Sequence, residues 1–208
     1  MIGGGIIGLA IIVALRALGS TARIVASVRY SFQAQAAHHL GADVVISPQQ
    51  GKVDVQLRHI LNSPALKPVL GPDVVVGGAP VVFECVGSSG SVAQALQYAA
   101  AGGCVLLVGL AGQPNGVDWT PIWLKELDLR GTFCYATESW NGQRINSMAL
   151  ALDLMTRNVV NLEHLVTHRF QIENYAHALD TVTSKGGSGV IKAVFDFRQT
   201  ATNATITS

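Results

Sequence analysis

The sequence predicts an α/β fold in which helices cover both faces of a doubly wound parallel sheet. Short β-branched runs alternate along the chain with helical segments, and glycines separate the two. Such alternation is the pattern of βαβ units, whose strands are parallel. The composition agrees, because a chain of 208 residues with 22 glycines and only 13% charged residues is typical of a protein that buries a large core.

Five short β-branched runs, each bounded by turn residues, mark the expected strands of this sheet. The early runs are almost wholly apolar, which is typical of strands that are buried on both faces. The five runs are residues 23–27, 44–46, 81–85, 104–108 and 129–135.

Helices are expected between these strands, and a glycine marks where each of the first three ends. They cover residues 7–18 before Gly19, 32–40 before Gly41 and 92–101 before Gly102. Further helices are expected at 53–61, from Thr120 and Pro121 onward, at 144–157 and at 174–183, with strands at 166–171 and 190–197 and a surface excursion before residue 79. We expect residues 199–208 to form a disordered tail.

Composition and charge exclude several classes of protein. The formal net charge is +1 without a basic cluster, so no nucleic-acid partner is expected, because such binding needs many cations on one face. The apolar start, residues 1–15, is about five residues short of a ~20-residue membrane span. Residues 85–117 carry no charge, but glycines divide this stretch into segments too short to cross a bilayer. No membrane partner is expected.

The cysteines indicate a reducing compartment. Cys85, Cys104 and Cys134 are odd in number and form no Cys-x-x-Cys pair. Neither a disulfide framework nor a cysteine zinc site is indicated. We expect buried free thiols and a cytoplasmic location.

The most informative motif is a glycine-rich loop near the start of the chain. Gly3, Gly5 and Gly8 form a Gly-x-Gly-x-x-Gly pattern that leads into the first expected helix. In such a loop the first glycine permits a tight turn, the second lets a pyrophosphate approach the backbone, and the third lets the helix pack closely. The start of the helix then offers N–H groups to phosphate. The loop predicts a Rossmann dinucleotide-binding domain, and a glycine-rich turn without a ligand is the alternative.

The end of the second expected strand bears on which dinucleotide binds. An NAD site usually carries a carboxylate about twenty residues after the loop, whereas an NADP site offers an arginine to the 2′-phosphate. Val28 stands at that distance from Gly8, and no carboxylate is nearby. Arg29 would pair with the phosphate, and Tyr30 would lie beside the adenine. We therefore predict NADP rather than NAD, with a solvated Arg29 as the alternative.

Other chemistries find little support. No tyrosine is followed by lysine four residues later, as short-chain dehydrogenases require. Residues 87–90 miss the Gly-x-Ser-x-Gly spacing of a serine hydrolase. His164 and His168 are four residues apart, but no acidic or cysteine partner completes a metal site, so a hydrogen-bonded or surface pair is expected.

Several further motifs follow the glycine loop in a fixed order. They are Leu-Gly-Ala-Asp at 40–43, Phe-Glu-Cys-Val-Gly at 83–87, Gly-Gly-Cys-Val at 102–105 and Val-Gly at 108–109. Together with the loop they resemble the cofactor half of the medium-chain, zinc-dependent alcohol dehydrogenases. Residues 118–127 resemble the threonine and sorbitol dehydrogenase-like branch of that family. The loop has the family's glycine form and not the alanine-containing form common in the zinc-free quinone reductases.

The resemblance implies which residues bind the cofactor. The glycine loop and the start of its helix would hold the pyrophosphate, while Val86 and Gly87 would line the cofactor cleft. Gly109 and Leu110 would meet the nicotinamide, and the backbone near Cys134 would close over its carboxamide. The whole expected set is Gly3, Gly5, Ile6, Ile7, Gly8, Arg29, Tyr30, Val86, Gly87, Gly109, Leu110 and Cys134. For Gly87 and Gly109 a tight turn after a strand is the alternative.

The resemblance also indicates what this sequence lacks. In the family, a GroES-like N-terminal domain uses a Cys, a Gly-His-Glu motif and a further ligand to hold a zinc that polarises the alcohol or carbonyl oxygen. No histidine here is followed by Glu. We expect zinc only in the missing domain, and no catalytic or metal-binding residue in this chain. Residues 161–198 resemble the remnant of that catalytic domain, a segment that returns to complete it, after a nucleotide-binding domain at 1–160.

The first strand is short. Only Met1 and Ile2 precede the loop, whereas a central strand usually needs about five residues. We expect an N-terminally incomplete stretch of a longer oxidoreductase.

The sequence thus predicts the NADP-binding part of a dehydrogenase that interconverts an alcohol or polyol and its carbonyl compound. Alone, the chain is expected to bind the cofactor weakly or not at all and to show no turnover. The alternative is a noncatalytic dinucleotide-binding or oligomerisation module. In either case the edge strand at 129–135 would allow a homodimer.

Overall fold

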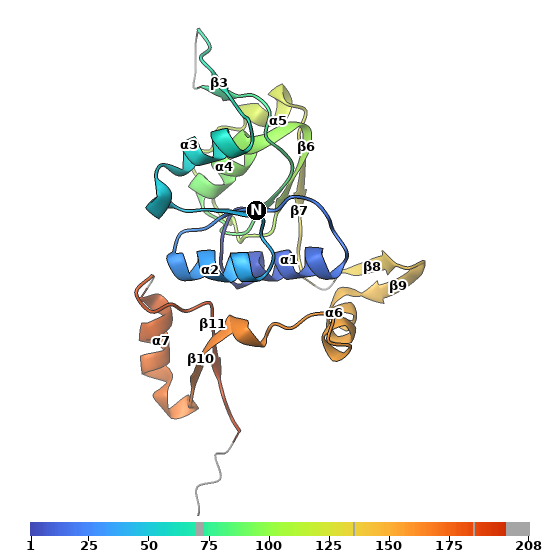
Figure 1. Cartoon of the computed structure of the whole chain (residues 1–208), viewed down its shortest axis with the longest axis vertical. Helices are drawn as coiled ribbons and strands as arrows, with labels where there is room; N and C mark the ends of the chain where they lie inside the picture. Colours follow the sequence, from blue (N-terminus) through green and yellow to red (C-terminus); the bar gives the residue numbers. More distant parts are fainter. Residues whose placement is uncertain (70–72, 135, 185, 199–208) are drawn as a thin grey trace, which may run out of the picture. The chain divides into compact units, whose positions relative to one another are not determined.

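The computed structural model describes residues 1–69, 73–134, 136–184 and 186–198, which form two compact units (Figure 1). Unit 1 covers Met1–Asn161, and unit 2 begins at Leu162. The tail expected to be disordered, 199–208, lies outside the described residues.

Unit 1 contains a parallel sheet. Its strands are β1 (Val25–Ser27), β2 (Val44–Ile46), β5 (Ala79–Glu84), β6 (Ala99–Leu107) and β7 (Asp128–Gly131). Ile2 makes parallel bridges to Ser27 in β1 and to Glu84 in β5, so the order is β2-β1-Ile2-β5-β6-β7. This is the Rossmann order, with Ile2 at the position of the first strand. The predicted fold class is confirmed.

Ile2 and its neighbours join the two sets of strands through backbone hydrogen bonds. Ile2 N–H donates to Phe83 O at 2.8 Å, and Cys85 N–H donates to Ile2 O at 2.9 Å. On the other side, Gly3 N–H donates to Ser27 O at 2.8 Å. A cavity of about 520 Å³ begins beside Met1 and continues between the N-terminal ends of β1 and β5.

Helices cover the sheet of unit 1. They are α1 (Ile6–Ala17), α2 (Ser31–His39), α3 (Val53–Ile60), α4 (Ser89–Tyr98) and α5 (Thr120–Leu124). A further helix, α6 (Ser147–Thr156), lies near the end of the unit. The right-handed crossovers of this strand order place α1 and α2 on one face and α4 and α5 on the other. No helix among the described residues has the length and apolarity that crossing a bilayer requires.

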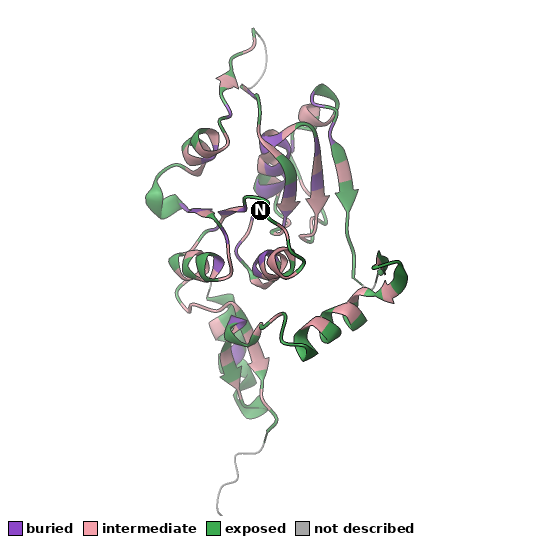
Figure 2. Ribbon diagram, turned by 45° about the vertical axis from the view of Figure 1, so that its right-hand side comes forward, coloured by how far each residue is buried: buried purple, intermediate pink, exposed green. Residues whose placement is uncertain are grey.

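The core of unit 1 lies between β5, β6 and α4. Figure 2 shows buried residues gathered on these elements. Val92 and Leu96 of α4 are fully buried against Val82 and Val105 of the strands. Burying a large aliphatic side chain is worth about 1.5–3 kcal/mol, so this contact anchors the half of the sheet that carries β5 and β6.

Among the helices of unit 1, two differ from expectation by several residues. The helix expected at 92–101 ends at Tyr98, because Ala99 turns to extended backbone and pairs with Ala79. The helix expected at 144–157 begins only at Ser147, because the Asn146 side chain accepts a hydrogen bond from Met148 N–H and caps it there. The preceding residues form an unexpected hairpin of β8 (Thr137–Trp140) and β9 (Gln143–Asn146).

The edge strand is shorter than predicted. Expected at 129–135, it ends at Gly131, and its partner β6 ends opposite at Leu107. The N–H of Val108, the residue after β6, donates to Glu84 O and so continues the pairing with β5. On the other side, Thr132 N–H donates to Leu107 O at 3.1 Å just past the end of β7. Tyr135 lies outside the described residues. The excursion before residue 79 carries a small antiparallel pair, β3 (Ala65–Leu66) and β4 (Val74–Val75).

Unit 2 is a small α/β element. Two short 3₁₀ turns, Glu163–Leu165 and Ile172–Asn174, precede β10 (Val166–Phe170) and α7 (Tyr175–Thr183), and β11 (Lys192–Phe195) follows. β10 and β11 pair in parallel. Leu165 and Ala178 are buried and form its small core.

Candidate cofactor site

The glycine loop leaves the sheet at Gly3 and enters α1. Gly3 has a φ of +104°, in the left-handed region that favours glycine. A methyl group on Gly8 would lie 2.1 Å from Gly3 O, so only glycine lets the helix pack so closely. A methyl group on Gly5 would meet nothing within 4 Å. The space beside Gly5 is therefore open to a ligand.

The start of α1 suits an anion. Gly5 is its N-cap residue and supplies no side-chain cap, and the first turn contains no acidic side chain. The N–H groups of that turn, which include those of Ile6 and Ile7, are left to solvent or to a ligand, and the helix dipole adds positive potential there. The open backbone at Gly5 and these N–H groups form a cradle that fits a pyrophosphate.

The turns that follow β5 and β6 meet the glycine loop at the switch point of the sheet. A methyl group on Gly3 would lie 2.7 Å from a side-chain carbon of Val86, and one on Gly87 would lie 2.7 Å from Leu110 O. A methyl group on Gly109 would lie 2.4 Å from Gly87 N. The structure thus brings these five predicted residues together at the carboxyl ends of the strands, where ligands bind in open α/β sheets.

The walls beyond this contact are apolar. Val86 is 53% exposed and Leu110 is 87% exposed. Apolar side chains that stand open beside a phosphate cradle provide a surface on which a flat ring can lie.

Glu84 orders the turn after β5, although the sequence motifs had assigned a role only to Val86 and Gly87 in this turn. Its carboxylate Oε1 accepts hydrogen bonds from Val86 N–H at 2.8 Å and from Gly87 N–H at 2.9 Å. The only signal in the sequence was a charged residue at the end of an otherwise apolar strand.

The predicted adenosine end lies after β1. Val28 is buried, and a methyl group on Gly4 would lie 2.6 Å from its side chain. The exposed Arg29 guanidinium lies 5.6 Å from the Tyr30 ring centre. The Gln33 side-chain oxygen accepts hydrogen bonds from the N–H groups of Arg29 and Tyr30, which fixes the backbone of both. An apolar residue thus stands where an NAD site usually has a carboxylate.

The cysteines differ in their surroundings. Cys85 and Cys104 are half-buried, and Cys134 is exposed on the segment after β7, so the expected burial of Cys134 is wrong. Burial raises the pKa of the Cys85 thiol to about 11. This thiol is therefore neutral at neutral pH.

No group of three His, Cys, Asp or Glu side chains suited to a metal gathers among the described residues. His168 shares a hydrogen bond with Thr167 and stacks on Phe170. His168 is thus hydrogen-bonded, one of the two states expected for this histidine pair.

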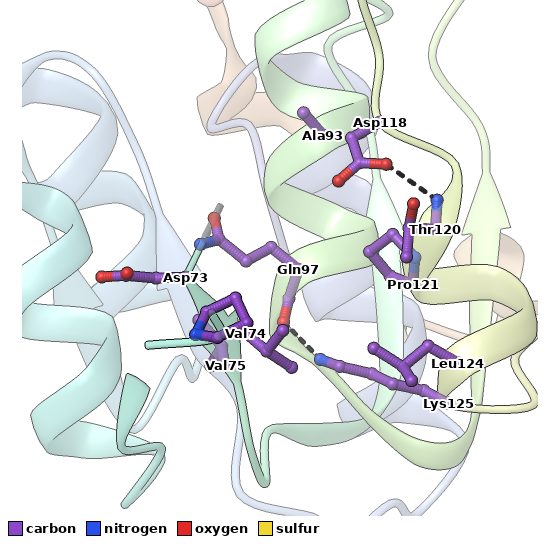
Figure 3. A pocket seen from close by; sticks show the side chains of 11 residues that line it. Asp73, Val74, Val75, Ala93, Gln97, Asp118, Thr120, Pro121, Leu124 and Lys125 are labelled. Carbon is purple, nitrogen blue, oxygen red and sulfur yellow. Dashed lines mark hydrogen bonds between the residues drawn. The ribbon is translucent and has the colours of Figure 1, made fainter. Parts of the chain in front are cut away.

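A second cavity of about 550 Å³ lies between α4, α5 and β4 (Figure 3). Lys125 lines it and is only 8% exposed. Its ammonium donates to Gln97 O at 2.6 Å and to Ala99 O at 3.0 Å, and burial lowers its pKa. The Asp118 carboxylate accepts from Thr120 N–H. The Lys125 ammonium thus binds carbonyl groups at the C-terminus of α4, and the Asp118 carboxylate binds an N–H group at the N-terminus of α5.

Comparisons with known proteins place this site in context. The sequence profile of the family described as zinc-binding dehydrogenase matches residues 7–150. L-idonate 5-dehydrogenase of Vitis vinifera is 30% identical over 94% of this chain and 48% of its own length. Sorbitol dehydrogenase of Bos taurus is 29% identical over 90% of this chain and 46% of its own length. The chain spans about half the length of the curated relatives it matches.

A solved structure agrees with these sequence matches. A zinc-binding dehydrogenase from Sinorhizobium meliloti 1021, bound to NADP, superposes with a TM-score of 0.66 and is 25% identical. The match covers 93% of this chain and 50% of that chain.

Proposed function

Because the chain belongs to the zinc-binding dehydrogenase family of the medium-chain alcohol dehydrogenases, we propose that it is the cofactor-binding part of an NADP-dependent alcohol or polyol dehydrogenase. One observation carries the proposal: open backbone at Gly5 lies at the start of α1, two residues after Gly3, which packs against the turn that follows β5. A cradle for phosphate and an apolar wall for a ring are the two parts that a dinucleotide needs.

The preference for NADP rests on the end of β1. Buried Val28 offers no acceptor to the ribose hydroxyls, and Arg29 follows it as an exposed cation whose backbone is held by Gln33. An arginine binds a phosphate through charge-assisted hydrogen bonds. The 2′-phosphate of NADP would therefore form such bonds with Arg29, whereas the ribose hydroxyl of NAD would not. Of the solved neighbours, one is bound to NADP and another is complexed with NADH, so the preference rests on Val28 and Arg29.

The bound cofactor would exchange a hydride with the carbon of an alcohol or carbonyl compound. The residues of this chain would hold the pyrophosphate at Gly5, Ile6 and Ile7 and seat the nicotinamide between Val86 and Leu110. In the whole protein, zinc and substrate would be held by residues outside this chain. The two curated relatives favour a polyol or related sugar acid as the substrate class.

A fluorescence titration of the purified chain with NADPH and NADH tests the proposal. We expect weak binding with NADPH the tighter ligand, and no reduction of NADP when alcohols or polyols are added. Equal affinities would remove the preference for NADP. Alcohol-dependent reduction of NADP would show that the chain is active alone, against the proposal.

We also propose a homodimer through the edge strand β7, whose pairing on β6 leaves its other side available. Asp128 and Arg130 on this strand form an ion pair, which neutralises the charge of the edge. Gel filtration with light scattering would give twice the chain mass if β7 pairs across a dimer, and a monomer would exclude it.

A further inference from the structure

Glu84 is a buried carboxylate that the cofactor site described above does not use for ligand contact. It is the last residue of β5 and is 0% exposed. Removing an ionised carboxylate from water is costly unless hydrogen bonds compensate. Its contacts must therefore account for its position.

The contacts of Glu84 reach both turns of the cleft. Its side-chain Oε1 accepts from the N–H groups of Val86 and Gly87 after β5. Its main-chain oxygen accepts from Val108 N–H at 2.9 Å and from Gly109 N–H at 2.8 Å after β6. One residue thus holds the turns of two neighbouring strands.

The second carboxylate oxygen is the unexpected feature. Glu84 Oε2 is buried and has no hydrogen-bond partner among the described residues. It lies against Gly109, where a methyl group would be 2.8 Å away. A cap for one turn needs one acceptor oxygen, so an unpaired second oxygen only adds cost if capping is the whole role. This oxygen instead packs beside Gly109, in the turn that follows β6.

We propose that Glu84 is a positioning residue that holds the Val86–Gly87 turn against the Gly109–Leu110 turn and so shapes the cleft for the nicotinamide half of the cofactor. The inference rests on the proposed function, because only a bound dinucleotide gives this half of the cleft its ligand. Glu84 is buried and acts through the two turns, so we expect its effect to be larger on the nicotinamide half than on the adenosine half. The adenosine half binds at the glycine loop and Arg29.

Paired titrations separate positioning from general stability. The ligands are NADPH and adenosine 2′,5′-bisphosphate, which lacks the nicotinamide, each followed by NMR up to millimolar concentration. For Glu84→Ala we expect the affinity for NADPH to fall on the order of tenfold, the effect of one or two lost hydrogen bonds, with the bisphosphate within about twofold. Glu84→Gln keeps one acceptor oxygen and should restore most of the NADPH affinity. Glu84→Asp keeps the charge but shortens the side chain, so it should lose NADPH affinity as Glu84→Ala does.

Tyr98→Phe is the matched control, since Tyr98 is buried and its hydroxyl bonds Asp54 away from both turns. It should lower the melting temperature and leave both affinities unchanged. Equal losses for both ligands in Glu84→Ala, or no loss in any variant that folds, would overturn the inference. A wild-type chain that binds only the bisphosphate would overturn it too, while the proposed function would stand. A wild-type chain that binds neither ligand, even at millimolar concentration, would overturn both the inference and the proposal that this chain alone forms a cofactor cradle.

Discussion

The ammonium group of Lys125 donates a hydrogen bond of 2.6 Å to the main-chain oxygen of Gln97, near the end of α4. A second hydrogen bond, to Ala99 O, holds the first residue of β6. The last carbonyl groups of a helix have no partner within it and carry partial negative charge, so a buried cation there satisfies both needs. Lys125 therefore fixes the point where helix becomes strand.

Replacing Lys125 with methionine should destabilise unit 1. The change keeps the length of the apolar stem but leaves two buried oxygens unpaired, which costs about 1–3 kcal/mol in the free energy of unfolding. Urea denaturation measures the loss. Lys52→Met, at an exposed position, should stay within about 0.5 kcal/mol of the wild type. Similar values for the two variants would show that the Lys125 contacts are not stabilising.

Two glycines of the loop should separate folding from binding. Gly5→Ala places a methyl group in open space at a φ of −76°, so stability should change by less than about 0.5 kcal/mol. The methyl would occupy the approach of the pyrophosphate, and NADPH affinity should fall at least about tenfold. Gly8→Ala forces a contact with Gly3 O and should instead lower the melting temperature. Unchanged NADPH binding in a folded Gly5→Ala variant would place the pyrophosphate elsewhere.

Arg29→Ala should abolish the preference for NADPH over NADH. The lost charge-assisted bonds to the 2′-phosphate should weaken NADPH binding about tenfold or more and leave NADH nearly unchanged. Arg23→Ala, near the other end of β1 and also exposed, serves as the control and should preserve the ratio of the two affinities. A ratio that falls equally in both variants would indicate a nonspecific charge effect.

In the purified 208-residue chain, where Met1 carries a free amino group, this group should make stability depend on pH. It donates to Val25 O, and its burial lowers its pKa from 8.0 to about 6. The unfolded chain then binds this proton more tightly than the folded chain between those values. The free energy of unfolding should therefore rise with pH across this window, by roughly 2–3 kcal/mol from pH 5.5 to 8.5.

N-terminal acetylation is the control for this pH dependence. It removes the titrating group and should flatten the part of the curve that the amino group contributes. The remaining slope belongs to other groups, the six histidines among them. An identical rise in the acetylated chain would exclude the amino group as its source.

Local signals in the sequence predicted most of the elements of the fold. The glycine stops and β-branched runs located α1, α2 and the five strands of the parallel sheet, because left-handed turns and buried strands restrict composition strongly. The helix expected at 92–101 ends before Ala99. Alanine is a strong helix former, but Ala99 is extended and pairs with β5. Pairing between distant segments overrode the local propensity there.

The hairpin of β8 and β9 was not predicted from the sequence, because its turn has a recognisable signal but its strands do not. Asn141 and Gly142 both have positive φ, as a two-residue hairpin turn requires, and this pair is a strong turn signal. The flanking strands are polar and mostly exposed. They therefore lack the apolar alternation by which a strand is recognised.

The candidate site was predictable in its parts but not in its connections. The glycine spacing located the loop, and the ends of the strands indicated which residues would meet there. The contact between Glu84 and Gly109 joins two strands through a buried carboxylate. No local pattern encodes such a contact, because it depends on how closely the two backbones pack.

The short segment that runs through Ile2 affects how the sheet of unit 1 can open. Its hydrogen bonds join the β1–β2 pair to the β5–β6–β7 set within the described chain. If the hydrogen bonds around Ile2 break, the sheet separates into two halves that can unfold independently. Each half then has an exposed strand edge that can pair with another chain. Resistance to aggregation would then depend mainly on the backbone hydrogen bonds around Ile2, at the centre of the sheet. The size of the hydrophobic core on either side would matter less. In hydrogen exchange, the amides of Ile2 and Gly3 should open ahead of those of β6.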